Sequence, residues 1–378
     1  MSYTADRLCY DADSHLMELS DWLVAHADPG VREKIRPLHL GGAGKLAEKA
    51  VSEAERRRTD PGAARALEDD VMGPKGWSAL GAFDPEERSR ALDLLGFQKQ
   101  LVFSTFAATQ FMGSDLELLY GGTRAHNRAM AAFCGADPRL IGVGMVPWAD
   151  PARTRAEAEE AVRLGCGAIL VPSHPGKGRS PTHPDHEGFW AFLQEAGIPF
   201  MTHIGGGGRP LPRAFHENGR PVTDFLGGGE NIRAKDYMVL HNPPEAFLSC
   251  LVLDGVLEKF PRLKGGCIEQ GALWVVPWLK RLDIAQATFQ KTEPSLRLPE
   301  KASDYVRRQL KFTPFPTEPV GWMIEQAGEE LFLFSSDYPH PEGGRDPLAR
   351  FEASLAETPD AAKERFYHGN FADLFASP

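Results

Sequence analysis

The chain has 378 residues, of which 42 % are hydrophobic and 25 % charged, a composition typical of a soluble globular enzyme with a large core. Its net charge of −10 argues against nucleic-acid and anionic-membrane partners, because both select basic surfaces. No stretch approaches the ~20 apolar residues of a membrane helix. The five cysteines form no C-x-x-C pair, which predicts reduced thiols in a cytoplasmic protein.

Short apolar runs alternate with helical patterns along the chain, which predicts parallel strands with helical crossovers. The expected strands are Leu8–Asp13, Gln100–Ser104, Leu140–Val146, Gly167–Pro172, Ile198–His203, Leu263–Ile268, Gln309–Pro314 and Leu331–Ser336. The expected helices are Pro85–Leu95, Asp115–Phe133, Asp150–Leu164, Asp185–Ala196, Pro244–Phe260, Leu273–Phe289, Pro319–Ala327 and Asp346–Ala356. Eight strand–helix units close a barrel, so we expect an α/β fold: a single (β/α)8 TIM-barrel domain over residues 1–378.

Two connections are much longer than the usual few residues. One spans about 21–83 after the first expected strand, and the other spans about 205–241 after the fifth. Both leave the carboxyl end of a strand, so we expect them to cover the mouth of the barrel as lids or substrate walls.

Imidazole and carboxylate side chains follow four of the apolar runs. Asp13 and His15 are two positions apart and therefore share one face of a strand. His203, Glu269 and Asp337 each stand at the carboxyl end of another run. Those ends converge in a parallel barrel, so Asp13, His15, His203 and Asp337 are the candidate ligands of one divalent ion, Zn²⁺ or Mn²⁺.

Each candidate taken singly has an ordinary structural explanation. Asp13 is equally compatible with a helix cap, and His203 with a core histidine bonded to a carbonyl group. Asp337 precedes Tyr338 and Pro339, as a turn former does. Their shared position at the carboxyl ends of expected strands favours the metal site over these explanations.

Several longer stretches resemble the amidohydrolase-2 family, which includes aminocarboxymuconate-semialdehyde decarboxylase and the γ-resorcylate-type decarboxylases. The similarity runs from Tyr10 to Phe375, and its most similar stretches are Asp11–Glu18, Pro199–His203, Gly255–Lys264, Trp278–Asp283 and Ser335–Gly343. The resemblance implies a metal-dependent TIM-barrel enzyme that forms a homodimer.

The resemblance also implies roles for individual residues. Asp13 and His15 stand where the family has an H-x-H or E-x-H ligand pair, and His203 stands at its fifth-strand ligand. Asp337 stands at the eighth-strand aspartate, which binds metal and often handles protons. The chain departs from the family twice: Asp13 replaces a histidine, which shifts the preference toward Mn²⁺, and Glu269 replaces a sixth-strand histidine.

Other residues are placed near the mouth by sequence position alone. The candidates for substrate contact are Glu18, Trp77, His241 and His340. Glu18 is equally compatible with a helix-start acid, and Trp77 with burial under the first insertion. One of the mouth-loop arginines is a candidate partner for a substrate carboxylate, the choice being open between Arg209, Arg213, Arg220 and Arg345.

These features leave three hypotheses open. The first is hydrolysis of a C–C, C–N or C–O bond in a small carboxylated, aromatic or cyclic substrate, with catalytic Asp337, Glu269 and His203. The second is nonoxidative decarboxylation of a hydroxybenzoate-like or semialdehyde acid, with Asp337 as proton donor. The third is a barrel that binds a ligand without catalysis.

Overall fold

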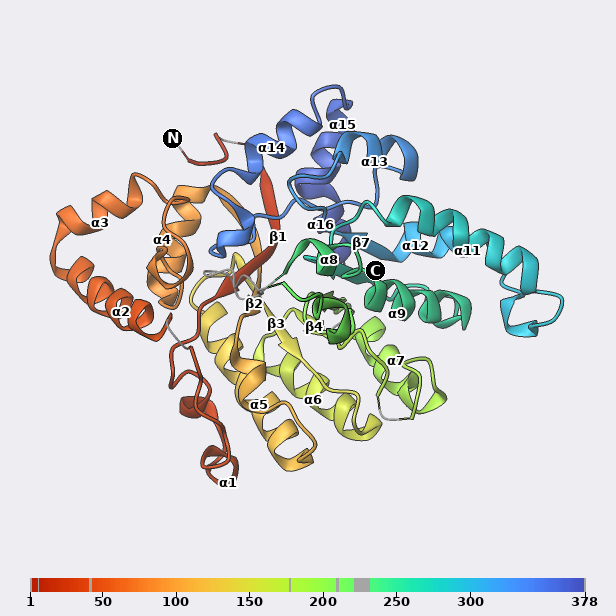
Figure 1. Cartoon of the computed structure of the whole chain (residues 1–378), viewed down its shortest axis with the longest axis horizontal. Helices are drawn as coiled ribbons and strands as arrows, with labels where there is room; N and C mark the ends of the chain where they lie inside the picture. The colour runs from red at the N-terminus through yellow and green to blue at the C-terminus, as the bar shows by residue number, and fades with distance from the viewer. Residues whose placement is uncertain are drawn as a thin grey trace.

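The protein is described by a computed structural model, which covers residues 2–5, 7–40, 43–176, 178–208, 211–220 and 232–376. Its centre is a curled sheet of seven parallel strands, paired in chain order from β1 to β7. The strands are β1 Cys9–Leu16, β2 Phe97–Ser104, β3 Leu140–Met145, β4 Ala168–Leu170, β5 Phe200–His203, β6 Gly265–Ile268 and β7 Leu310–Phe312. Figure 1 shows the helices arranged around the outside of these strands.

The helices occupy most of the connections between strands. Their bounds are α1 Pro29–Arg32, α2 Gly44–Thr59, α3 Pro61–Glu68, α4 Pro85–Leu95, α5 Leu116–Cys134, α6 Pro151–Leu164, α7 Glu187–Ala196, α8 Ala234–Tyr237, α9 Asn242–Leu253, α10 Val256–Lys259, α11 Val275–Phe289, α12 Ala302–Gln309, α13 Val320–Ala327, α14 Pro347–Ser354, α15 Asp360–Glu364 and α16 Asn370–Phe375. Seven of the eight expected helices are present as single helices, and the eighth is divided in two.

Aspartate side chains begin several of these helices, as their sequence positions predict. Asp84, Asp115 and Asp150 each accept hydrogen bonds from backbone N–H groups of the first turn of α4, α5 and α6. The stretch expected as one helix over 244–260 is instead two, α9 and α10. Gly255 separates them in a left-handed conformation with φ of +77°, which ends the first helix.

The segment 331–338 joins the two edges of the sheet, although it lacks the continuous ladder expected of an eighth strand. On one side, Phe312 of β7 donates its N–H to Leu331 and accepts from Leu333. On the other side, Ala12 of β1 donates to Phe334, and Asp337 donates to Asp13. The first and last parts of the chain are thereby held side by side.

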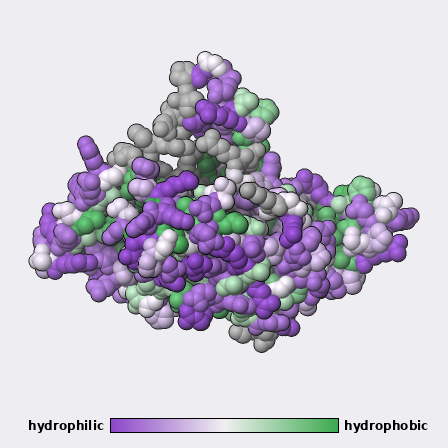
Figure 2. Space-filling model, turned by 90° about the horizontal axis from the view of Figure 1, so that it is seen from below, coloured by the Kyte–Doolittle hydropathy of each residue, from purple (hydrophilic) through white to green (hydrophobic). Residues whose placement is uncertain are grey.

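Two apolar layers pack against the sheet. One cluster takes residues from β1 to β6, including Phe103, Met201 and Ile268, together with Phe371 and Leu374 of α16. A larger cluster packs the helices against the strands. Hydrophilic residues cover most of the face in Figure 2, in keeping with a mean hydropathy of −0.32. Among the described residues, no helix is long and apolar enough to span a bilayer.

Helices occupy parts of the two long connections. The connection after β1 holds α1, α2 and α3, and Figure 1 places α2 and α3 to one side of the strands. The connection after β5 holds α8 near the front of Figure 1. Residues 209–210 and 221–231 of this second connection lie outside the described residues.

Candidate metal centre

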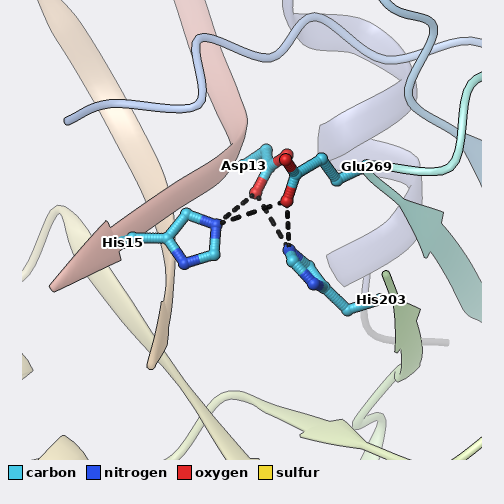
Figure 3. A group of neighbouring side chains, drawn as sticks. All are labelled: Asp13, His15, His203 and Glu269. Carbon is cyan, nitrogen blue, oxygen red and sulfur yellow. Dashed lines mark ion pairs between the residues drawn. The ribbon is translucent and has the colours of Figure 1, made fainter. Parts of the chain in front are cut away.

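Four side chains from three strand ends meet at one point. Asp13 and His15 come from β1, His203 ends β5, and Glu269 follows β6 (Figure 3). Asp13 Oδ1 lies 3.4 Å from His15 Nε2 and 3.5 Å from His203 Nε2. Glu269 Oε2 lies 3.2 Å from His203 Nε2 and 3.7 Å from His15 Nε2. One potential ligand atom from each residue lies within 4.8 Å of the others.

A second group overlaps the first and contains Asp337 and His340. It shares His15 and Glu269, and its candidate ligand atoms also lie within 4.8 Å of one another. Asp337 Oδ1 is 3.6 Å from His15 Nε2 and 3.1 Å from His340 Nδ1. The structure thus places three of the four expected ligands, Asp13, His15 and His203, in one group with Glu269, and places Asp337 in a second group that shares His15 and Glu269.

The donor set fits a divalent cation. Buried polar atoms normally have hydrogen-bond partners, yet Asp13 Oδ1 and His15 Nε2 are buried and have none among the described residues. Ligand atoms about 2.0–2.2 Å from a common ion lie roughly 3–4 Å apart, as these atoms do. Carboxylate oxygen and imidazole nitrogen are ligands for both Zn²⁺ and Mn²⁺.

Two of the clustered carboxylates stand on strained backbone. Glu269 and Asp337 have φ of +54° and +52°, a region that residues other than glycine rarely adopt. Each such position costs on the order of 1–3 kcal/mol and is commonly found at functional sites. The fold holds both: Thr313 Oγ1 accepts from the Glu269 N–H at 2.8 Å, and Gly343 packs so closely that a Cβ there would lie 2.9 Å from the Asp337 Cβ.

A buried polar network lies next to the ligands. Asp11 accepts from the Ser336 N–H and hydroxyl at 2.8 and 2.6 Å and from Gln100 Nε2 at 2.8 Å. Arg88, fully buried, donates to Gln100 and to the backbone oxygen of His15. Burial raises the pKa of Asp11 to about 7 despite these hydrogen bonds. The network ties β1, β2 and the 331–338 segment together where β1 is irregular, between Asp11 and Ser14.

The pKa values of His15 and His340 are shifted in opposite directions. Burial lowers the pKa of His15 well below its usual range, and His340 and His203 lower it further, which favours the neutral imidazole that binds metals. Burial also lowers the pKa of His340, but Asp337 and other acids outweigh it and raise that pKa to about 9. The ring of His340 stacks on His15 at 3.8 Å, and its Nε2 is 2.9 Å from Thr105 Oγ1.

Glu18 and Trp77 support the loop after β2. Glu18 is fully buried and accepts from the backbone N–H groups of Thr105, Phe106 and Ala107. Burial raises the pKa of Glu18 above its usual value, and these hydrogen bonds offset only part of that rise. Trp77 is buried, donates to the Glu18 backbone oxygen and stacks on Phe106 at 5.4 Å. Both residues therefore position Thr105, which contacts His340.

A cavity of about 450 Å³ opens beside the ligands. His15, His203 and His340 line one side, and its remaining walls include Phe103, Met112, Met145, Leu170 and His174. Apolar side chains dominate these walls, as in most small-molecule sites. Among the described residues that line this cavity, none is a lysine or an arginine.

The other predicted contact residues lie elsewhere. His241 stacks on Trp274 at 5.7 Å and lines a different cavity, with Gln270 and Phe315. Arg213 and Arg220 are exposed, and Arg345 pairs with Asp70 on the surface at 2.7 Å. Arg209 lies outside the described residues.

The comparisons with known proteins identify the family of the chain. The family model described as Amidohydrolase matches residues 10–376. The chain belongs to the amidohydrolase family. The resemblance stated from the sequence is therefore confirmed, and family membership supports an enzyme and not a non-catalytic barrel. No curated protein sequence matches the chain.

Solved amidohydrolase-family structures share the fold at low sequence identity. An amidohydrolase from Mycobacterium avium subsp. paratuberculosis K-10 has a TM-score of 0.75 and 21 % identity, with 99 % of each chain covered. 5-Carboxyvanillate decarboxylase from Sphingomonas paucimobilis has a TM-score of 0.61 and 20 % identity, covering 97 % of this chain and 98 % of that one. A dihydroxybenzoic acid decarboxylase from Polaromonas sp. JS666, with bound manganese and the inhibitor 2-nitroresorcinol, has a TM-score of 0.61 and 16 % identity, covering 98 % and 97 %.

Sequence patterns did not identify several residues of the centre. Thr105, Met112, Met145 and His174 come from separate loops and strands, and no spacing in the chain links them. Arg88 lies within the correctly expected helix α4, where an arginine normally predicts an exposed face. Only the three-dimensional arrangement assigns these residues to the site.

Proposed function

We propose that the chain is a metal-dependent hydrolase that acts on a small, largely apolar substrate. The proposal rests on the charge of the centre: Asp13, Glu269 and Asp337 bring three carboxylates to the candidate ligands, against two imidazoles from His15 and His203. Three carboxylates balance the charge of a divalent ion and of the protonated His340. The centre therefore has no surplus positive charge for an anionic group and favours a neutral carbonyl group.

Within this proposal, Asp13, His15, His203 and Glu269 would hold the ion. Such an ion would supply positive charge near the substrate and lower the pKa of water toward about 7. Asp337 accepts a proton from the attacking water and returns it to the departing group, so that water is added across the broken bond. His340 orients the Asp337 carboxylate through the 3.1 Å contact of its Nδ1. Asp337 lies in the second group of possible ligands, with His15, Glu269 and His340, so it could also serve as a fifth ligand of the ion.

Nonoxidative decarboxylation is the second candidate. It is favoured by the shared fold with decarboxylases of aromatic acids and by the apolar cavity, which has room for a substituted ring. In this case Asp337 delivers a proton to the carbon that loses CO₂. A substrate carboxylate at the centre would then be balanced by the protonated His340, whose pKa is raised to about 9.

Isotope and product analysis separates the two candidates. The Mn²⁺-loaded protein is screened against aromatic acids and cyclic or β-dicarbonyl compounds in H₂¹⁸O. Hydrolysis places ¹⁸O in the product without releasing CO₂, whereas decarboxylation releases CO₂ and leaves the product free of solvent oxygen. CO₂ release without ¹⁸O incorporation would overturn the hydrolase proposal.

The proposal extends to the whole chain. We propose that the 331–338 segment completes a (β/α)8 barrel as its eighth unit, and that residues 1–378 form one domain with the insertions at about 21–83 and 205–241 as walls of the mouth. A cytoplasmic homodimer without nucleic-acid or membrane partners stays a prediction. Size-exclusion chromatography with light scattering tests the oligomeric state.

A further inference from the structure

A second pocket of about 460 Å³ lies at the opposite end of the sheet from the metal centre. Its lining includes Ile198, just before β5, and Lys264, just before β6, whereas His203 and Glu269 lie at or beyond the carboxyl ends of these strands. We call this cavity the basal pocket. Its six cationic side chains are Arg262, Lys264, Arg307, Arg308, Lys311 and Arg365.

The positive charge of the basal pocket is only partly balanced. Two acidic residues line it: Glu330 pairs with Arg307 at 3.0 Å, and Asp373 pairs with Arg365 at 2.9 Å. Outside the pocket lining, Glu300 pairs with Arg308 at 3.1 Å. These pairs leave a surplus of cations in a chain whose overall charge is −10.

The two lysines form the least balanced part of this surplus. Lys311 is buried and its Nζ donates to the Glu330 backbone oxygen at 2.7 Å, while Lys264 Nζ donates to the Arg308 backbone oxygen at 2.8 Å. A carbonyl group satisfies one N–H but does not neutralise the charge. An ammonium group has three donors, and the bonds found among the described residues occupy one on each lysine.

Two further observations agree with a missing anion. Burial lowers the pKa of Lys311 to about 8, and the neighbouring Lys264 and Arg365 contribute to that shift. The Nε of Arg365 is buried and has no hydrogen-bond partner among the described residues. Clustered cations in a concave site attract anions, and arginine and lysine are the usual phosphate-binding side chains.

We propose that the basal pocket binds an organic phosphate monoester. The phosphate group takes the place between Lys264, Lys311 and Arg365, where it would supply the missing negative charge and acceptor oxygens. The apolar part of the ligand lies against Leu193, Ile198 and Leu374, which line the same pocket. This site is separate from the proposed catalytic centre and does not depend on its function.

Calorimetric titration of the full-length, Mn²⁺-loaded protein with phenyl phosphate and with inorganic phosphate tests the proposal. Phenyl phosphate is expected to bind more tightly, because only it reaches the apolar wall. Lys264→Gln and Arg365→Gln each weaken binding by about tenfold or more, since a hydrogen bond to a charged group contributes about 1.5–3 kcal/mol. Lys49→Gln on α2, an exposed lysine, is the matched control and leaves the affinity unchanged.

Lysine labelling gives a local readout that requires no variant. Phenyl phosphate is expected to protect Lys264 from limited acetylation, measured by mass spectrometry, while Lys49 stays reactive. Unchanged affinity in both basal variants, or unchanged acetylation of Lys264 at saturating ligand, would overturn the site. Equal affinity for the two probes would overturn the role of the apolar wall and identify inorganic phosphate as the ligand.

Discussion

The two ends of the parallel sheet carry opposite charge in the same fold. At the carboxyl ends, buried carboxylates and imidazoles surround a point with the spacing of metal ligands. At the amino ends, lysines and arginines surround a pocket of similar volume. A strand has a buried apolar middle, so its two ends are free to carry unrelated chemistry. The comparison suggests that each end recognises a ligand of the opposite charge, a cation at one and an anion at the other.

The largest expected effect is at the carboxyl end. Asp337→Asn removes the proposed proton acceptor while keeping nearly the same shape, so turnover of the substrate identified by screening should fall by about 10²–10⁴-fold. Circular dichroism and thermal unfolding should match the unchanged protein. Asp69→Asn, on the exposed surface, is the control and should keep full activity. Near-normal turnover in the Asp337 variant would refute the assigned role.

The second-largest effect is expected from removing the negative charge of Glu269, one of the proposed metal ligands at the carboxyl ends of the strands. Glu269→Gln should weaken Mn²⁺ binding by at least about tenfold, because even residues that only support a ligand contribute 10–100-fold to metal affinity. Dialysis against a chelator followed by Mn²⁺ titration measures the change. Glu325→Gln, exposed on α13, should bind the metal normally. Unaltered affinity in the Glu269 variant would leave Asp337 as the fourth ligand.

The buried network beneath the ligands should affect stability. Asp11→Ala leaves the donors of Ser336 and Gln100 without their acceptor, and each unsatisfied buried group costs about 1–3 kcal/mol. We therefore expect a lower midpoint in urea unfolding of the metal-free protein. A surface control, Asp69→Ala, should unfold at the original midpoint. An unchanged midpoint for Asp11→Ala would show that the network does not hold the sheet edges together.

The smallest expected effect concerns Lys311, at the amino ends of the strands, and is a dependence of the free energy of unfolding on pH. The pKa of Lys311 is lowered from 10.5 to about 8 in the folded protein, so the unfolded chain binds more protons between these values. Stability of the unchanged protein relative to Lys311→Met should therefore rise from pH 8 to 10.5, by up to about 1.4 kcal/mol per pH unit. Urea unfolding across this range measures the difference. A difference that stays constant with pH would contradict the lowered pKa.

Local sequence patterns predicted most of the fold but only part of the site. Apolar runs located seven strands, and Asp84, Asp115 and Asp150 marked helix starts, because both signals lie within a few residues. The eighth run, 331–336, was apolar but pairs too irregularly to form a strand. Asp13, His15 and His203 lie in one group of possible ligands and Asp337 in a second that shares His15, whereas their role as metal ligands stays a prediction.

The remaining features depend on distances across the fold. The partnership of Thr105 with His340 joins loops 235 positions apart, and no local pattern marks it. His241 was expected to face the mouth from the start of a helix, but its ring stacks on Trp274 beside a different cavity. The sequence does not predict the basal pocket, because its cations come from three separate stretches, 262–264, 307–311 and 365, each with an ordinary surface charge.

The hydrogen bonds between Asp11 and Ser336 span 325 positions of the chain. During synthesis on the ribosome, β1 emerges first, whereas Ser336, which bonds to Asp11 of β1, emerges only when nearly all of the protein has been translated. Contacts between such distant positions form slowly, because a long loop must close before they contribute stability. The nascent chain therefore cannot acquire its complete ligand set early, and premature termination before Ser336 should yield a protein without a functional centre.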